Sequence, residues 1–156
     1  MDGYTILAGF LLFFLFFIYI TWFGFSIKVE NEKNEGSEIK MNPYFPIVTV
    51  PHMRGAVLAQ KKGVLDKYNE KMFEAIWIKA LNLNDQIILS EVATESGIDG
   101  NEFAEGIMSD EIKEGLKINT QYAVDNGAFG VPTFYFNDEM YWGIDSMKFL
   151  IEDLNK

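Results

Sequence analysis

The sequence predicts a mostly helical α/β domain with its strands near the C-terminus and an apolar segment at the N-terminus. Three observations support this organisation. Thr-Phe-Tyr-Phe at 133–136 combines residue types that suit a half-buried strand. Amphipathic helical patterns fill most of residues 52–127. Residues 3–27 contain no charged residue. We therefore divide the chain into a hydrophobic segment (1–27), a polar linker (28–40) and a globular part (41–156), which comprises a helical region (52–127) and a strand-hairpin-helix region (128–156).

The hydrophobic segment has two interpretations. A helix over residues 3–27, at about 1.5 Å per residue, would cross a bilayer core of roughly 30 Å. Trp22, Phe23 and Phe25 would then suit the membrane interface. A run of Phe, Leu, Ile and Tyr is also typical of AT-rich DNA translated out of frame, so a truncated or mis-called start is the alternative. A genuine helix predicts a membrane-anchored protein, and otherwise we expect a cytoplasmic one.

Composition excludes several kinds of function. The net charge of −10 and the lack of a basic stripe argue against a nucleic-acid partner. The absence of cysteine excludes disulfides, thiolate metal sites and Cys-x-x-Cys redox chemistry. His52 is the single histidine, so we predict no metal site. Any chemistry would be non-redox and would use no thiol of the protein.

The globular part begins with an extended segment and continues as helices. Three prolines hold residues 42–51 extended, because each also restricts the residue before it. Helical periodicity and capping residues then predict five helices, over 52–62, 66–82, 85–96, 101–107 and 109–126. Asn84 and Asp85 would cap the third helix, whose apolar stripe consists of Ile87, Ile88, Val92 and Ala93. The apolar stripes of these helices are typical of a hydrophobic core.

The last thirty residues predict a strand, a hairpin and a closing helix. Pro132 stands at the mouth of the first strand, where a missing N–H breaks no central hydrogen bond. Asn137, Asp138 and Glu139 predict the turn, and residues 140–142 the return strand. The closing helix has an apolar face, formed by Met147, Leu150, Ile151 and Leu154.

Three sequence blocks resemble one known family. Gly-Ala-Phe-Gly-Val-Pro-Thr-Phe (127–134) is followed by Tyr-Trp-Gly-Ile-Asp (141–145), and upstream lie Asn-Pro-Tyr-Phe-Pro (42–46) and Pro-His-Met-Arg-Gly-Ala (51–56). Together they resemble the DsbA-like branch that holds 2-hydroxychromene-2-carboxylate isomerases and kappa-class glutathione transferases. The resemblance covers roughly residues 41–155 and implies a thioredoxin-like domain with a helical insertion. It also implies a cis peptide bond between Val131 and Pro132.

The resemblance implies a glutathione site at this proline. The backbone of Val131 would pair with the cysteinyl part of glutathione. Asp145 would take the ammonium group of the γ-glutamyl end, and backbone amides near Ser146 its carboxylate. Taken without the family, Asp145 is a good helix N-cap, and the two roles are compatible. The residues implied to bind glutathione are Val131, Pro132, Trp142, Gly143, Ile144, Asp145 and Ser146.

The chain departs from the family pattern at several positions. Asn42 and Val48 fall in the block implied to contact substrate, but the family often has asparagine where Val48 stands. Many members carry arginine where this chain has Ser146. No serine lies in the Ser-Pro-aromatic setting that activates the glutathione thiolate in the family, so we predict no catalytic residue.

Three functions remain open. The first is a glutathione-dependent isomerase or glutathione transferase acting on a small aromatic compound, or a truncated and inactive form of one. The second is a membrane-tethered, non-catalytic binding module, and the third is a structural remnant. A sheet reduced to the hairpin of 133–142 would have an open edge, which predicts marginal stability or association as a homodimer.

Overall fold

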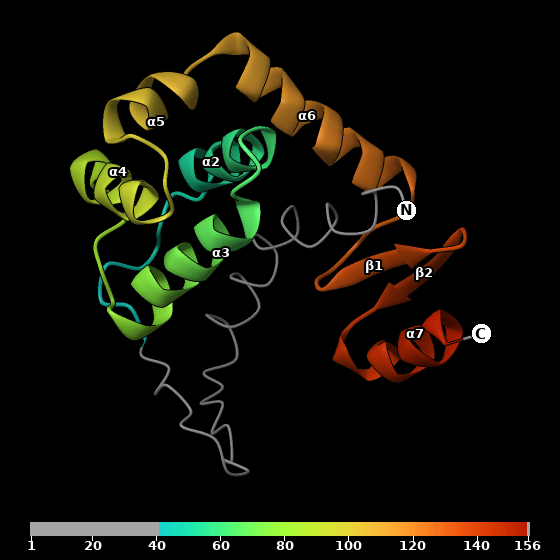
Figure 1. The fold of residues 1–156 in the computed structure, drawn as a ribbon. Helices are drawn as coiled ribbons and strands as arrows, with labels where there is room; N and C mark the ends of the chain where they lie inside the picture. Colours follow the sequence, from blue (N-terminus) through green and yellow to red (C-terminus); the bar gives the residue numbers. More distant parts are fainter. Residues whose placement is uncertain (1–40, 156) are drawn as a thin grey trace. The chain divides into compact units, whose positions relative to one another are not determined.

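The computed structural model describes residues 41–155, which fall into two compact units (Figure 1). The first comprises residues 41–116 and the second residues 117–155, so the division lies within helix α6. No helix of the described residues is long and apolar enough to cross a membrane. The hydrophobic segment predicted at 3–27 and the linker at 28–40 lie outside the described residues.

Both units follow the predicted order of elements. The first unit contains α2 (Val50–Lys61), α3 (Leu65–Phe73), the π-helical turn η2 (Glu74–Ile78), α4 (Gln86–Glu95), α5 (Gly100–Gly106) and the start of α6 (Asp110–Asp125). The second contains the rest of α6, β1 (Thr133–Phe136), β2 (Glu139–Trp142), the 3-10 turn η3 (Ile144–Ser146) and α7 (Met147–Leu154). The prediction of a mostly helical α/β chain is confirmed for the described residues.

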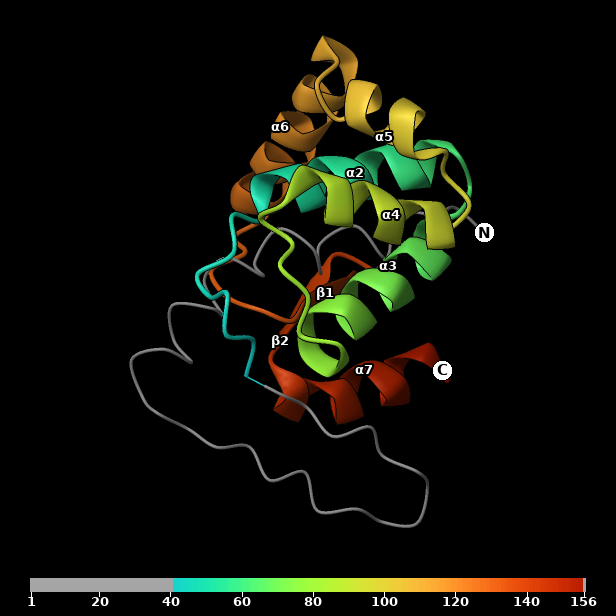
Figure 2. The ribbon, with the colours of Figure 1, turned by 90° about the vertical axis from the view of Figure 1, so that its left-hand side faces the viewer.

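The core of the first unit forms where α2, α3, α4 and α5 pack against one another (Figures 1 and 2). Tyr68 and Phe103 are fully buried, and their ring centroids lie 6.1 Å apart. The Tyr68 hydroxyl donates a hydrogen bond to the carbonyl oxygen of His52 over 3.0 Å. Gly55 makes this approach possible, because a Cβ atom at its position would lie 2.1 Å from the Tyr68 hydroxyl oxygen.

Capping residues set the start of two helices. The Asp85 carboxylate accepts a hydrogen bond from the backbone N–H of Ile87 over 2.8 Å, which confirms the predicted start of α4. Asp99 caps α5 in the same way. The prediction that Ile87 faces the core is wrong, since its side chain is 72% exposed. The buried face of α4 instead follows the spacing of Leu89, Val92 and Ala93.

The second predicted helix is not regular throughout. The periodicity predicts one helix over 66–82, but α3 ends at Phe73 and a π-helical turn follows. The chain then leaves the helix at Ala80, which has a φ of 52°. The side-chain amide of Asn42 donates hydrogen bonds to the carbonyl oxygens of Ile76 (3.2 Å) and Leu81 (2.9 Å). A side chain distant in sequence therefore supplies partners for carbonyl groups at the end of this helix.

Replacing Asn42 with alanine should destabilise the first unit. The change would leave buried carbonyl groups without partners, at a cost of about 1–3 kcal/mol in the free energy of unfolding. Urea unfolding followed by circular dichroism measures this loss. Asn101→Ala, at an exposed position of α5, is the matched control and should change the free energy of unfolding by less than about 0.5 kcal/mol. Equal effects of the two variants would contradict the structural role of Asn42.

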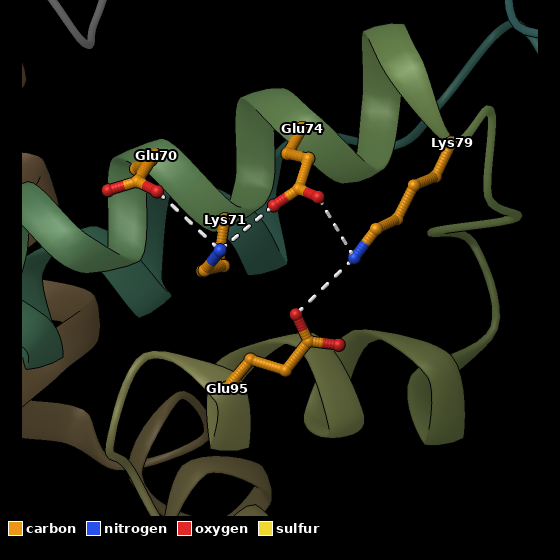
Figure 3. Close-up of polar contacts among 5 residues, drawn as sticks. All are labelled: Glu70, Lys71, Glu74, Lys79 and Glu95. Carbon is orange, nitrogen blue, oxygen red and sulfur yellow. Dashed lines mark hydrogen bonds and ion pairs between the residues drawn. The ribbon is translucent and has the colours of Figure 1, made fainter.

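A chain of ion pairs on the surface extends from α3 along η2 to α4 (Figure 3). Lys71 contacts Glu70 and Glu74, and Lys79 contacts Glu74 (3.2 Å) and Glu95 (3.5 Å). Hydrogen bonds from Lys71 and Lys79 lower the pKa of Glu74. Exposed pairs of this kind each contribute about 0–1 kcal/mol, so they orient side chains more than they stabilise the fold.

The second unit is built on an antiparallel hairpin. Thr133 pairs with Trp142, and Phe136 with Glu139. The turn is one residue shorter than predicted, since it contains only Asn137 and Asp138 and Glu139 belongs to β2. Both turn residues have positive φ (50° and 64°), as a two-residue type I′ turn requires. Within residues 41–155 the sheet has two strands.

Helix α7 contacts β2 in this unit (Figure 2). The Tyr141 hydroxyl lies 2.5 Å from a carboxylate oxygen of Asp153, which joins the strand to the helix. Of the four residues predicted to form the apolar face of the closing helix, Leu150 is buried, whereas Met147, Ile151 and Leu154 are exposed. A sheet of two four-residue strands is too small to cover the whole stripe.

Candidate ligand-binding site

The Val131–Pro132 peptide forms the entrance to β1, and it is cis, as hypothesised from the sequence. The residues on either side are fixed by hydrogen bonds. The Gly130 carbonyl oxygen accepts from the Thr133 hydroxyl (2.7 Å), and the Pro132 carbonyl oxygen accepts from the Gly143 N–H (2.9 Å). Between them, the N–H and C=O of Val131 have no hydrogen-bond partner among residues 41–155.

This arrangement can bind an extended, peptide-like ligand. Backbone N–H and C=O groups are strong donors and acceptors that native structures usually pair. A strand edge with one free donor and one free acceptor can form two hydrogen bonds with an added extended chain. Val131 presents such a pair at a rigid position, since its neighbours are held on both sides.

Two aromatic side chains lie beside this position. The ring centroids of Phe129 and Trp142 are 4.8 Å apart, with an angle of 46° between the ring planes. Trp142 also lies over Gly130, where a Cβ atom would be 2.2 Å from the indole nitrogen. Phe129 is 59% exposed and Trp142 is 49% exposed. Sequence reasoning included Trp142 but missed Phe129, although an aromatic residue placed between glycines in a loop was an available signal.

The segment after β2 contains the remaining residues that are predicted to bind the γ-glutamyl end of glutathione. Gly143 has a φ of 77°, and Ile144 and Asp145 are exposed. The interpretation of Asp145 as an N-cap is wrong, because α7 begins two residues later with Ser146 at the cap position. Among residues 41–155, the Asp145 carboxylate has no hydrogen-bond or ion-pair partner. Its charge is therefore available to a ligand.

Ser146 is less available than the sequence predicts. Its backbone N–H and its hydroxyl both donate to the Gly143 carbonyl oxygen, over 3.2 Å and 2.8 Å. The N–H of Met147 donates to Ile144 in the same turn. An incoming carboxylate would need amides further along α7, and the predicted role of Ser146 stays a prediction.

The predicted substrate residues Asn42 and Val48 belong to the first unit. Asn42 is buried, and its side chain also accepts a hydrogen bond from the Tyr44 N–H, so the structure gives it a structural role. Val48 is 63% exposed. Asn84, which sequence reasoning missed as a site residue, accepts from the Val48 N–H (2.8 Å) and donates to the carbonyl oxygens of Tyr44 and Pro46. Asn84 thus fixes the backbone that displays Val48.

The single histidine does not face a ligand. His52 is buried in α2, and neither ring nitrogen has a hydrogen-bond partner among residues 41–155. Burial lowers the pKa of His52 to about 4 and outweighs the backbone groups of Val48 and Thr49, which act in the opposite direction. The ring is therefore neutral near pH 7 and acts as part of the core.

Comparison with known proteins agrees with the family resemblance seen in the sequence. Residues 30–155 match the model of the DSBA-like thioredoxin domain. A 2-hydroxychromene-2-carboxylate isomerase of Pseudomonas sp. (strain C18) is 31% identical over 86 residues, which are 55% of this chain and 40% of that protein. The isomerase of the same name from Pseudomonas putida is 29% identical over 85 residues, covering 54% of this chain and 41% of that protein.

A third relative extends the match slightly. A 2-hydroxychromene-2-carboxylate isomerase of Sphingobium xenophagum is 28% identical over 96 residues, which are 61% of this chain and 49% of that protein. The chain thus spans less than half the length of each of these curated relatives.

Proposed function

The chain belongs to the DsbA-like thioredoxin domain family, and we propose that it acts as a glutathione-dependent isomerase on a small aromatic compound. Three relatives carry the name 2-hydroxychromene-2-carboxylate isomerase, which supports isomerisation as the reaction class. The observation that carries the proposal is the free N–H and C=O of Val131, at a rigid strand entrance. An extended tripeptide meets the donor and acceptor pattern of this position.

The proposed reaction needs no redox partner. The glutathione thiolate adds to the β-carbon of a conjugated carbonyl compound, a C–S bond forms, and an electron pair moves to the carbonyl oxygen. The former double bond is then single and can rotate. The electron pair returns, the C=C bond forms again and the thiolate leaves. We assign no residue of this chain to thiolate activation, and its residues contribute binding and orientation.

The γ-glutamyl end of glutathione would lie at Asp145. Its exposed carboxylate has no partner among the described residues, so an ammonium group would gain an ion pair without displacing another contact. The segment that contains Val131 and the segment that contains Asp145 are joined by the hydrogen bond from the Gly143 N–H to the Pro132 carbonyl oxygen. Both ends of the tripeptide would therefore bind to one connected part of the chain.

Replacing Asp145 with asparagine should weaken glutathione binding about twofold to fivefold, because an ion pair at an exposed site contributes up to about 1 kcal/mol. Isothermal titration calorimetry with the full chain measures the Kd of glutathione and of glutaryl-cysteinyl-glycine, which lacks the ammonium group. The second ligand should bind the wild type and D145N equally. Glu152→Gln removes an exposed carboxylate from α7 and should leave both affinities unchanged.

The titration with glutathione, together with an assay of 2-hydroxychromene-2-carboxylate isomerisation, decides between the proposed functions. Absence of glutathione binding to the wild type would overturn the glutathione-dependent function. Binding without isomerisation of 2-hydroxychromene-2-carboxylate would favour the non-catalytic binding module. Equal losses in D145N and E152Q would remove Asp145 from the site and leave the Val131 contact to be tested separately.

A further inference from the structure

The Phe129–Trp142 pair is a feature that glutathione binding by itself does not explain. Both side chains are about half exposed, although aromatic rings of this size gain most when they are removed from water. Their rings contact each other at 4.8 Å, and Trp142 is held close to the backbone at Gly130. The pair is thus fixed in position while much of its surface faces solvent.

The position of the pair identifies what it would contact. Gly130 immediately precedes Val131, whose backbone would hold the cysteinyl residue in the function proposed above. During the reaction the aromatic compound is covalently attached to the cysteinyl sulfur. Its ring must therefore lie within a few bond lengths of Val131, which is where the indole of Trp142 lies over the adjacent glycine.

We propose that Phe129 and Trp142 form the contact surface for the aromatic ring of the substrate while that substrate is attached to glutathione. This inference rests on the proposed function and adds Phe129 to its site. Flat aromatic rings favour offset or tilted contact with other aromatic rings, and this pair offers two such faces in a fixed relation. The pair would select aromatic over aliphatic substrates without making any polar contact.

The test compares two glutathione derivatives that differ in the group on sulfur. S-(2,4-dinitrophenyl)glutathione carries a flat aromatic ring, and S-methylglutathione carries none. Titration calorimetry with the full wild-type chain should give a Kd about tenfold lower for the dinitrophenyl derivative. In Phe129→Ala this preference should fall to about twofold or less, with the Kd of S-methylglutathione unchanged. Trp142→Leu should reduce the preference in the same direction.

Phe149→Ala is the matched control. Phe149 is 52% exposed on α7, and its ring lies 4.7 Å from the ammonium nitrogen of Lys148. This variant should keep the tenfold preference, and circular dichroism verifies that all three variants are folded. A preference that survives in both F129A and W142L, or one that F149A also abolishes, would overturn the inference alone. If glutathione itself fails to bind the wild type, the proposed function falls and this inference with it.

Discussion

Gly55→Ala should destabilise the first unit by about 3 kcal/mol, the largest effect that we expect from one added methyl group. The new Cβ atom would lie 2.1 Å from the Tyr68 hydroxyl oxygen and 2.7 Å from a ring carbon of Phe103. Both rings are fully buried, so neither can move aside without opening the core. Overpacking typically costs about 1–3 kcal/mol, and loss of the Tyr68–His52 hydrogen bond adds the cost of an unpaired buried hydroxyl.

Urea unfolding followed by far-ultraviolet circular dichroism measures this change, and Gly115→Ala is its control. Gly115 is also a glycine within a helix, but a Cβ atom there would meet only the end of the Val57 side chain, at 3.1 Å. The gain in helix propensity is up to about 1 kcal/mol, so G115A should be neutral or slightly stabilising. A G55A chain as stable as G115A would show that the Tyr68 contact is not as tight as the structure has it.

The second large effect is a loss of stability in acid that depends on His52. The pKa of this buried imidazole is lowered from 6.5 to about 4. Below pH 6.5 the unfolded chain takes up a proton that the folded chain still excludes, so the free energy of unfolding falls as the pH falls. The loss reaches about 3 kcal/mol near pH 4 and changes little below that, where both states are protonated.

The measurement is the free energy of unfolding between pH 7 and pH 4, for the wild type and for His52→Leu. Leucine leaves no unpaired polar group, because the imidazole has no hydrogen-bond partner among the described residues. Carboxylates titrate in both proteins, so the difference between the two curves isolates the histidine. The curves should diverge below pH 6.5 by about 3 kcal/mol, and parallel curves would show that His52 is accessible to protons in the folded state.

The sequence predicted those features that depend on residues close to one another in the chain. Asp85 was identified as a cap, and the hairpin around Asn137 and Asp138 was placed to within one residue. The cis peptide at Pro132 was hypothesised from its motif and is confirmed. In each case the signal and the structure lie within a few residues.

Features that depend on distant partners could not be predicted in this way. The π-helical turn after Phe73 and the residues that follow it contain carbonyl groups that bind the distant side chain of Asn42, and helical periodicity contains no signal for such a contact. Ile87 matched a helical stripe but lies in the first turn of α4, away from the buried face. At the site, the proximity of Phe129 to Trp142 results from hairpin pairing and from Gly130, so only the structure revealed the pair.

Two asparagines fix the backbone path of residues 42–48, so this path does not depend on which side chains the other residues of the segment carry. Asn42 and Asn84 bind backbone groups of Tyr44, Pro46 and Val48 and none of their side chains. Substitutions at Tyr44 and Val48, which are both exposed, would therefore leave the path of the chain unchanged. In a directed library, substitutions at Tyr44 and Val48 should therefore preserve the backbone path of this segment, whereas the two asparagines should stay fixed.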